Sequence, residues 1–214
     1  TRKESSAASD VYKRQLFAKE GANVAIGYYN EHQDAKDTVR RLEELGVKAK
    51  AYAHDLKDET QSQQLVKDVV DDFGGLNILV NNGGVQFPRD HFEEITPEQV
   101  KETFQTNIFG MIFLSQAAVP YLNDGDSIIN TTSVTAYRGS GHLIDYSATK
   151  GAIVSFTRSL ATTLMEKNIR VNAVAPGPIY TPLIPATFDE EKVENQGGGT
   201  PMGRRGQPVS YTHL

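Results

Sequence analysis

Strand-like and helix-like segments alternate along most of this 214-residue chain. Short apolar runs predict buried strands at residues 23–28, 48–53, 76–81, 126–132 and 169–174. Segments with helical periodicity lie between them, at residues 31–45, 58–73, 96–122 (two successive helices) and 145–166. Strands joined by helices pair in parallel, with the helices on the faces of the sheet. The alternation therefore predicts an α/β fold with a doubly wound parallel sheet.

Capping residues mark some of the predicted helix ends. Thr96 and Pro97 form a typical helix start, with threonine as N-cap and proline at the first helical position. Residues 16–20 look like the tail of a further helix, for which Gly21 is a plausible C-cap. The first predicted strand therefore follows a helix.

Composition limits the class of protein. A chain of 214 residues with 38% hydrophobic residues can form one sizeable core, and one α/β domain is the simplest prediction. The net charge of −5 argues against a nucleic-acid partner. No apolar run approaches the roughly 20 residues that span a bilayer, so we predict no membrane partner and a cytoplasmic protein. The absence of cysteine excludes disulfides and thiolate catalysis, and we predict no metal site.

Polar residues and glycines follow the predicted strands. Asp55, Asn82, Ser133 and the Pro176–Gly177 pair each come just after a strand. In a parallel sheet the carboxyl ends of the strands share one edge, and ligands bind there. We expect these residues to line that edge. Two alternatives stay open: Asp55 could be a neighbour of a helix N-cap, and the asparagine–glycine segment could be a plain turn.

Ser133, Tyr146 and Lys150 can share one proton. Tyr146 and Lys150 are four residues apart in a predicted helix, so both side chains project from one face. A lysine ammonium beside a phenol favours the phenolate and is expected to lower the pKa of Tyr146. Ser133, at a strand end, is suited to orient a substrate oxygen. A Tyr-x-x-x-Lys spacing often arises by chance, so its meaning depends on the motifs around it.

Those motifs resemble the short-chain dehydrogenase/reductase family. The segments Asn81–Gly84, Asn107, Ser133, Tyr146 to Lys150 and Pro176–Thr181 have the order and spacing of that family's motifs. The resemblance covers Leu16 to about Pro208. Residues 133–139, 182–188 and 201–206 are similar to a bacterial branch of general-stress, aldehyde-reductase and glucose-dehydrogenase-like oxidoreductases.

The resemblance implies roles for individual residues. The implied catalytic residues are Asn107, Ser133, Tyr146 and Lys150. The implied NAD(P)-binding residues are Tyr28, Asp55, Leu56, Asn82, Gly83, Tyr146, Lys150, Pro176, Gly177, Ile179 and Thr181. Gly83 departs from the family pattern, which has alanine there, and this should cost some rigidity. Tyr28 stands where an acid would select NAD, so the choice between NAD and NADP stays open.

The two ends of the chain are expected to lie outside the domain. Residues 10–15 and 209–214 can be encoded by DNA strings that are reverse complements over nearly their whole length, as expected of a translated sequencing adapter. We therefore predict an artefactual or disordered leader (residues 1–15), a truncated Rossmann-like domain (16–208) and an artefactual tail (209–214). The first strand with its glycine-rich turn, and the last strand, should be missing. We expect this fragment to bind nucleotide weakly or not at all and to be inactive, whereas the intact protein is expected to be an oxidoreductase.

The predicted function is hydride transfer between NAD(P) and a carbonyl or secondary alcohol in an aldehyde, ketone or sugar. Tyr146 would be the general acid/base, Lys150 would lower its pKa, Ser133 would orient the substrate oxygen and Asn107 would support a proton relay. Two alternatives are a non-catalytic nucleotide-sensing protein of the same fold and an NAD(P)-dependent epimerase. The resemblance also implies a homodimer or homotetramer that forms through residues 110–122 and 145–166.

Overall fold

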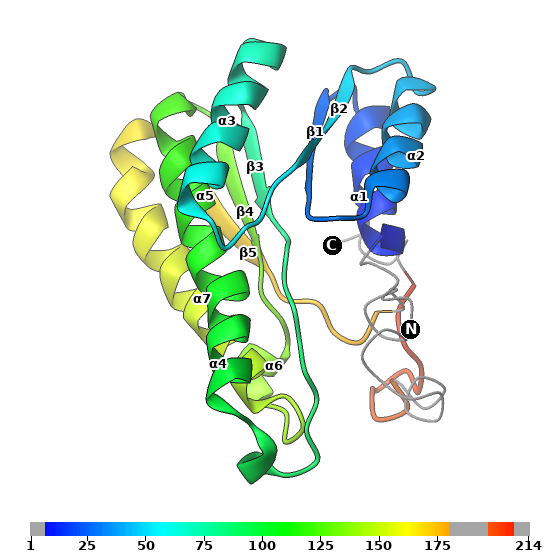
Figure 1. Cartoon of the computed structure of the whole chain (residues 1–214), viewed down its shortest axis with the longest axis vertical. Helices are drawn as coiled ribbons and strands as arrows, with labels where there is room; N and C mark the ends of the chain where they lie inside the picture. Colours follow the sequence, from blue (N-terminus) through cyan, green and yellow to red (C-terminus); the bar gives the residue numbers. More distant parts are fainter. Residues whose placement is uncertain (1–6, 180–196, 208–214) are drawn as a thin grey trace. The chain divides into compact units, whose positions relative to one another are not determined.

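A computed structural model describes residues 7–179 and 197–207 of the chain (Figure 1). The chain divides into two compact units, which are described separately. The first comprises residues 1–53 and 177–214, and the second comprises residues 54–176. Thr181 and the motif at 182–188 lie outside the described residues, as does the predicted tail at 209–214.

The first unit contains a two-stranded parallel sheet. Its elements are α1 (Ala7–Lys19), β1 (Val24–Tyr28), α2 (His32–Glu43) and β2 (Ala49–Ala53). Val24 is opposite Ala49 and Tyr28 is opposite Ala53. The core is a small apolar cluster of Ala18, Ile26, Leu42 and Ala49. Gly21 follows α1 with a φ of 86°, which is the left-handed conformation expected of a glycine C-cap.

Helix α1 begins before the domain boundary predicted from the sequence. The sequence predicts an artefactual or disordered leader up to residue 15, whereas the structure has a continuous helix from Ala7. The helix is anchored by its C-terminal part, where Ala18 is buried, and residues 7–15 extend it toward the N-terminus. The predicted leader, artefactual or disordered, stays a prediction. The adapter origin of residues 10–15 stays a prediction.

The second unit carries a three-stranded parallel sheet in the order β3, β4, β5. The strands are β3 (Ile78–Asn81), β4 (Ser127–Thr131) and β5 (Arg170–Val174). The longer helices are α3 (Glu59–Phe73), α4 (Pro97–Phe104), α5 (Gly110–Ala118) and α7 (Ile144–Leu164). Shorter helical turns are η1 (Phe92–Glu94), η3 (Val119–Tyr121), α6 (Thr135–Arg138) and η4 (Met165–Lys167). A π-helix, η2 (Gln105–Phe109), joins α4 to α5.

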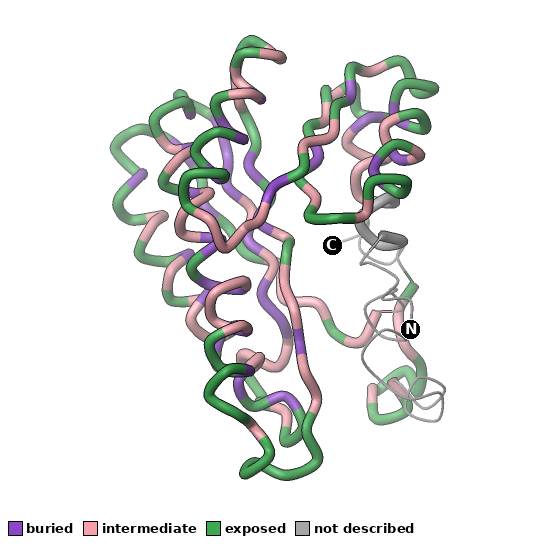
Figure 2. The backbone as a smooth tube through the Cα atoms, viewed as in Figure 1, coloured by how far each residue is buried: buried purple, intermediate pink, exposed green. Residues whose placement is uncertain are grey.

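The core of this unit lies between the sheet and its helices. Ile78 pairs with Ser127 and Ser127 with Arg170, so the three strands run in register. Buried Leu79, Ile128 and Val171, one from each strand, pack with apolar residues of α3, α5 and α7. Figure 1 shows α3, α5 and α7 on the same side of the sheet, and Figure 2 shows buried residues along the strands and the helix faces.

The predicted positions of the elements are confirmed within a few residues. All five predicted strands form, and Thr96 is the N-cap of α4, where its side chain accepts a hydrogen bond from the Gln99 amide. The two helices predicted at 96–122 form as α4 and α5, and the π-helix between them was not predicted. None of the described helices is long and apolar enough to cross a membrane.

Candidate active site

Helix α7 holds Tyr146 and Lys150 one turn apart on the same face, as their spacing predicts. Lys150 is 4% exposed, and its Nζ donates a hydrogen bond to the Thr131 carbonyl oxygen at 2.9 Å. The same Nζ lies 5.3 Å from the centroid of the Tyr146 ring. Thr132 Oγ1 donates to the Lys150 carbonyl at 2.6 Å, which ties this turn of α7 to the end of β4. The ammonium therefore has a fixed place beside the phenol.

Ser133 lies just after β4 and is buried. Its Oγ accepts hydrogen bonds from the backbone N of Thr135 at 3.2 Å and from Thr135 Oγ1 at 3.1 Å. The residue after it, Val134, donates its N–H to the Pro176 carbonyl at 3.0 Å. Contacts from α6 and from the end of β5 thus hold the segment that carries this hydroxyl.

The protonation of Tyr146 differs from the sequence prediction. Burial raises the pKa of Tyr146 above its usual value of 10.0, and the side-chain hydrogen bond with Ser133 lowers it by less. The predicted net lowering of the Tyr146 pKa is therefore wrong for this structure. The physical reason is that removing the partly buried phenol from water penalises its anion more than the Ser133 contact favours it. With its pKa raised, Tyr146 keeps its proton at neutral pH.

Asn107 occupies the π-helix η2 and is 1% exposed. Its Oδ1 accepts the N–H of Val85 at 2.7 Å, and its Nδ2 donates to the Val85 carbonyl at 2.9 Å and to Thr149 Oγ1 at 3.1 Å. The side chain therefore pairs with a backbone segment in the manner of a neighbouring strand. π-bulges widen a helix locally and often occur at functional sites. We therefore attribute the position of the Asn107 side chain opposite Val85 to η2.

The segment after β3 lies close to the loop that carries Leu56. Asn82 Oδ1 accepts a hydrogen bond from Thr131 Oγ1 at 3.0 Å, which links the ends of β3 and β4. A Cβ at Gly83 would lie 2.5 Å from Leu56 Cδ1, and one at Gly110 would lie 2.7 Å from the Leu56 carbonyl oxygen. Leu56 thus fills the space that an alanine at position 83 would need. Alanine, the residue of the family pattern, would therefore need the end of the Leu56 side chain to move.

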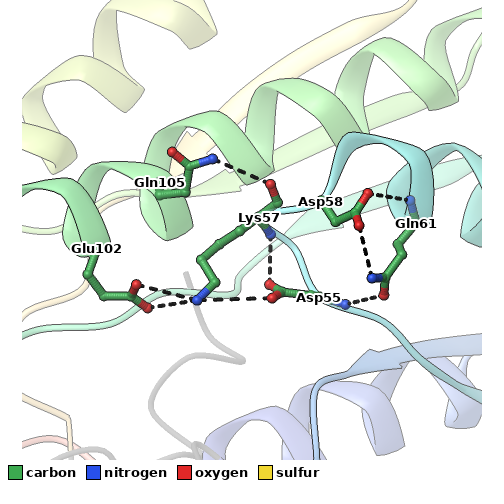
Figure 3. A network of polar contacts seen from close by, with 6 residues as sticks. All are labelled: Asp55, Lys57, Asp58, Gln61, Glu102 and Gln105. Carbon is green, nitrogen blue, oxygen red and sulfur yellow. Dashed lines mark hydrogen bonds and ion pairs between the residues drawn. The ribbon is translucent and has the colours of Figure 1, made fainter.

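Asp55 takes part in a polar network at the start of α3 (Figure 3). One carboxylate oxygen accepts the backbone N–H of Lys57 at 2.9 Å, and the other lies 4.0 Å from Lys57 Nζ. Lys57 Nζ also pairs with Glu102 at 3.1 Å. Asp58 is the N-cap of α3, and its carboxylate accepts the N–H of Gln61. Asp55 therefore does neighbour a helix N-cap, which was the structural alternative for this residue.

The remaining predicted cofactor residues are not all in the second unit. Pro176 ends that unit, and its carbonyl accepts the Val134 amide. Gly177 and Ile179 belong to the first unit, where Ile179 forms a parallel bridge with Gly206. Tyr28 ends β1, and its hydroxyl lies 2.9 Å from His32 Nδ1. Thr181 lies outside the described residues. The structure thus brings together Asp55, Leu56, Asn82, Gly83 and Pro176 with the four predicted catalytic residues in one unit.

A family described as enoyl-(acyl carrier protein) reductase matches residues 14–212. The chain is 56% identical over 195 residues to the uncharacterized oxidoreductase YhdF of Bacillus subtilis, covering 91% of this chain and 68% of that protein. The chain belongs to the short-chain dehydrogenase/reductase family. It is also 48% identical over 208 residues to the NADPH-dependent aldehyde reductase 1 of Arabidopsis thaliana, covering 92% of this chain and 72% of that one.

Solved structures of this family have the same fold. A short-chain dehydrogenase from Burkholderia cenocepacia, in complex with NADP, has a TM-score of 0.86 at 30% identity and covers 94% of this chain and 82% of its own. The comparisons confirm the predicted Rossmann-like α/β fold class, the family, the oxidoreductase class and NAD(P) as its cofactor class.

The second unit has features that fit part of such a cofactor. A Cβ at Gly84 would lie 3.6 Å from Lys150 Nζ and 3.2 Å from Asn107 Oδ1, so the glycine leaves that place free of any side chain. A ribose or nicotinamide group can approach the backbone closely at such a glycine. Lys150, Tyr146 and the Asn82–Gly84 segment would hold this part of NAD(P).

Two pairs of polar residues that support the site were not predicted from the sequence. Gln99 and Asp145 are both buried and joined by a hydrogen bond, and Lys57 pairs with Glu102 of α4. Neither pair has a sequence signature, because Lys57 and Glu102 are 45 residues apart and Gln99 and Asp145 are 46 residues apart. Asp145 immediately precedes Tyr146, and its position in the first turn of a predicted helix was the one available signal.

Proposed function

We propose that this protein moves a hydride between NAD(P) and the carbonyl or alcohol carbon of a small substrate, with Tyr146 as the general acid/base. The observation that carries the proposal is the arrangement of Ser133, Tyr146 and Lys150: a neutral, partly buried phenol, a hydrogen bond to Ser133 and an ammonium fixed 5.3 Å from the centroid of the phenol ring. NAD(P), when bound, supplies or accepts the hydride.

The residues of the chain would manage the proton. In the reducing direction Tyr146 donates its phenolic proton to the substrate oxygen, on which negative charge develops. Its raised pKa suits this role, because the phenol keeps its proton at neutral pH until that oxygen becomes basic. Lys150 then stabilises the phenolate electrostatically. Ser133 orients the substrate oxygen, and Asn107 holds Val85 and α7 in place.

The substrate class follows from chemistry and from the named relatives. The site offers a hydroxyl and a phenol to one oxygen atom, which suits an aldehyde, ketone or sugar carbonyl. The similarity to an NADPH-dependent aldehyde reductase and to a structure with NADP supports aldehydes and NADP as the first pair to try. Tyr28, rather than an acid, ends β1 and is compatible with that cofactor.

The experiment uses the full-length protein and follows the absorbance of reduced nicotinamide while aldehydes, ketones, sugars and secondary alcohols are offered with NADPH, NADH or their oxidised forms. Net consumption or formation of the reduced cofactor with one of these substrates supports the proposal. Conversion of a substrate without any net absorbance change would identify an epimerase instead. Binding of NADP without conversion of any substrate would favour a nucleotide-sensing protein.

We also propose that the intact protein is a homodimer or homotetramer that forms through α5 and α7. Phe109, directly before α5, is 44% exposed, as expected of an apolar residue that another subunit covers. Light scattering of the purified protein tests this, and substituting Phe109 with glutamate should shift the protein toward the monomer.

A further inference from the structure

Asp145 is a buried carboxylate with no part in the proton transfer proposed above. It lies in the first turn of α7, directly before Tyr146, and is 5% exposed. Its Oδ2 accepts hydrogen bonds from Gln99 Nε2 at 3.1 Å and from Thr103 Oγ1 at 2.7 Å. Both partners belong to α4, which packs against α7. A buried carboxylate oxygen needs such donors, because burial without a hydrogen bond is disfavoured, and the other oxygen, Oδ1, is buried without a hydrogen bond from the described residues.

Gln99 connects this carboxylate to the loop Val85–Asp90, which follows the Asn82–Gly84 segment. Gln99 Nε2 donates to the Phe87 carbonyl at 3.0 Å as well as to Asp145, and its Oε1 accepts Arg89 Nε at 2.7 Å. The amide thus uses two N–H donors and one oxygen acceptor. The reverse orientation would place its oxygen against two acceptors, so the partners fix the orientation of this side chain.

The same loop is held at two further points. Its first residue, Val85, pairs with the Asn107 side chain through both backbone groups. Near its other end, the N–H of Arg89 donates to the His142 carbonyl at 3.0 Å, in the segment that leads into α7. The loop is therefore fixed to α4, to η2 and to the segment before Tyr146. The loop is thus hydrogen-bonded to the segment that leads directly into the first turn of α7, which carries Tyr146.

We propose that Gln99 and Asp145 are positioning residues that hold the Val85–Asp90 loop against the first turn of α7 and thereby set the substrate side of the site. The effect on substrate binding rests on the proposed function. The contacts of Gln99 and Asp145 that hold the loop, called the clamp below, can be measured without turnover. Gln99 is suited to this task because its amide nitrogen donates to both the Phe87 carbonyl and Asp145. Glutamate has the same size and shape but lacks these two N–H donors.

The test is hydrogen exchange of the purified protein and of its Gln99→Glu variant. Glutamate would place an oxygen against the Phe87 carbonyl and Asp145, so amide exchange in residues 85–90 should rise about tenfold or more, while that of the β3, β4 and β5 core stays unchanged. Gln63→Glu, an exposed change in α3, is the matched control and should leave the loop as it is. Unchanged loop exchange in Gln99→Glu, or an equal rise across all three strands, would overturn the proposal.

A second pair of variants distinguishes the hydrogen-bond acceptor of Asp145 from the packing of its side chain. Asp145→Ala removes the acceptor and should increase loop exchange as Gln99→Glu does, whereas Asp145→Asn keeps an oxygen acceptor and should restore most of the protection. Equal loss of protection in both variants would contradict the proposal.

Kinetics then tests the role in substrate binding. Gln99→Glu should raise the KM of the carbonyl substrate about tenfold, with kcat changed less than about threefold and the Kd of NADP within about twofold. A variant that loses only thermal stability, with an unchanged KM, would show that the clamp is structural and would overturn the positioning role. An absence of turnover in the full-length protein and all its variants, together with the expected exchange difference, would refute the proposed function and leave the positioning contacts of Gln99 and Asp145 intact.

Discussion

The two units of this chain hold their strand ends in different ways. In the second unit, buried side chains bind the backbone where β3 and β4 end: Asn107 pairs with Val85, and Lys150 donates to Thr131. In the first unit, β1 ends at Tyr28, whose hydroxyl contacts His32 in an exposed hydrogen bond, and the core is a small apolar cluster. The proton transfer proposed above uses only residues of the second unit, whose strand ends are fixed by buried polar groups.

The largest expected difference between the two units is in kcat, when Lys150 of the second unit or Lys50 of the first is replaced by alanine. Lys150→Ala removes the buried ammonium beside Tyr146, and we expect kcat to fall roughly 10²–10⁴-fold. Lys50→Ala removes an exposed lysine of β2 that lies over the Tyr52 ring at 5.2 Å. Steady-state kinetics of the second variant should match the parent protein. Equal losses in both variants would remove the distinction between the units.

The next effect compares two asparagines. Asn107→Asp keeps the size of the side chain but sets an oxygen against the Val85 carbonyl, so we expect a loss of about 2–4 kcal/mol in the free energy of unfolding and a lower kcat. Asn23→Asp keeps the one acceptor that binds the Lys48 amide at 2.9 Å in an exposed position, and it should cost less than about 0.5 kcal/mol. Denaturant titration measures both. A harmless Asn107→Asp would show that the paired backbone segment does not need this amide.

A smaller loss of stability is expected when a methyl group is added at Gly83 or Gly110, where it would meet Leu56. Gly110→Ala would bring a methyl group 2.7 Å from a backbone carbonyl oxygen, and we expect a cost of about 2–3 kcal/mol. Gly83→Ala meets only the far end of the Leu56 side chain, which can rotate, so about 1 kcal/mol is expected. Leu56→Ala should relieve the Gly83→Ala cost and leave most of the Gly110→Ala cost. Thermal denaturation of the single and double variants checks this order.

The smallest effect concerns pH. Burial raises the pKa of Tyr146, so the phenol should stay protonated, and kcat for carbonyl reduction should stay roughly constant from pH 7 to pH 9. Below pH 10 the folded and unfolded states both keep this proton. Above pH 10 the unfolded state releases it first, so the free energy of unfolding should fall as the pH rises toward the folded pKa. Tyr146→Phe should lack that fall, and an identical alkaline slope in both proteins would contradict the raised pKa.

The sequence predicts the site where its geometry is local. Tyr146 and Lys150 are four residues apart on one helix, and Asn82, Ser133 and Pro176 follow strands, so their places follow from regular structure. The structure departs from prediction where distant residues meet. The π-helix that positions Asn107 has no sequence signal, and the pKa of Tyr146 depends on its burial. The contact of Gln99 with Asp145 depends on how α4 packs against α7.

The most direct test of the central claim removes one hydroxyl from each unit. Tyr146→Phe deletes the proposed proton donor, whereas Tyr52→Phe deletes the hydroxyl of a β2 tyrosine and keeps its ring. Single-turnover rates of carbonyl reduction, measured beside the Kd of NADP, should fall at least about 10³-fold for Tyr146→Phe with the Kd within roughly threefold. Tyr52→Phe should keep both values. A Tyr146→Phe variant that reduces the carbonyl at the rate of the parent protein would contradict the account.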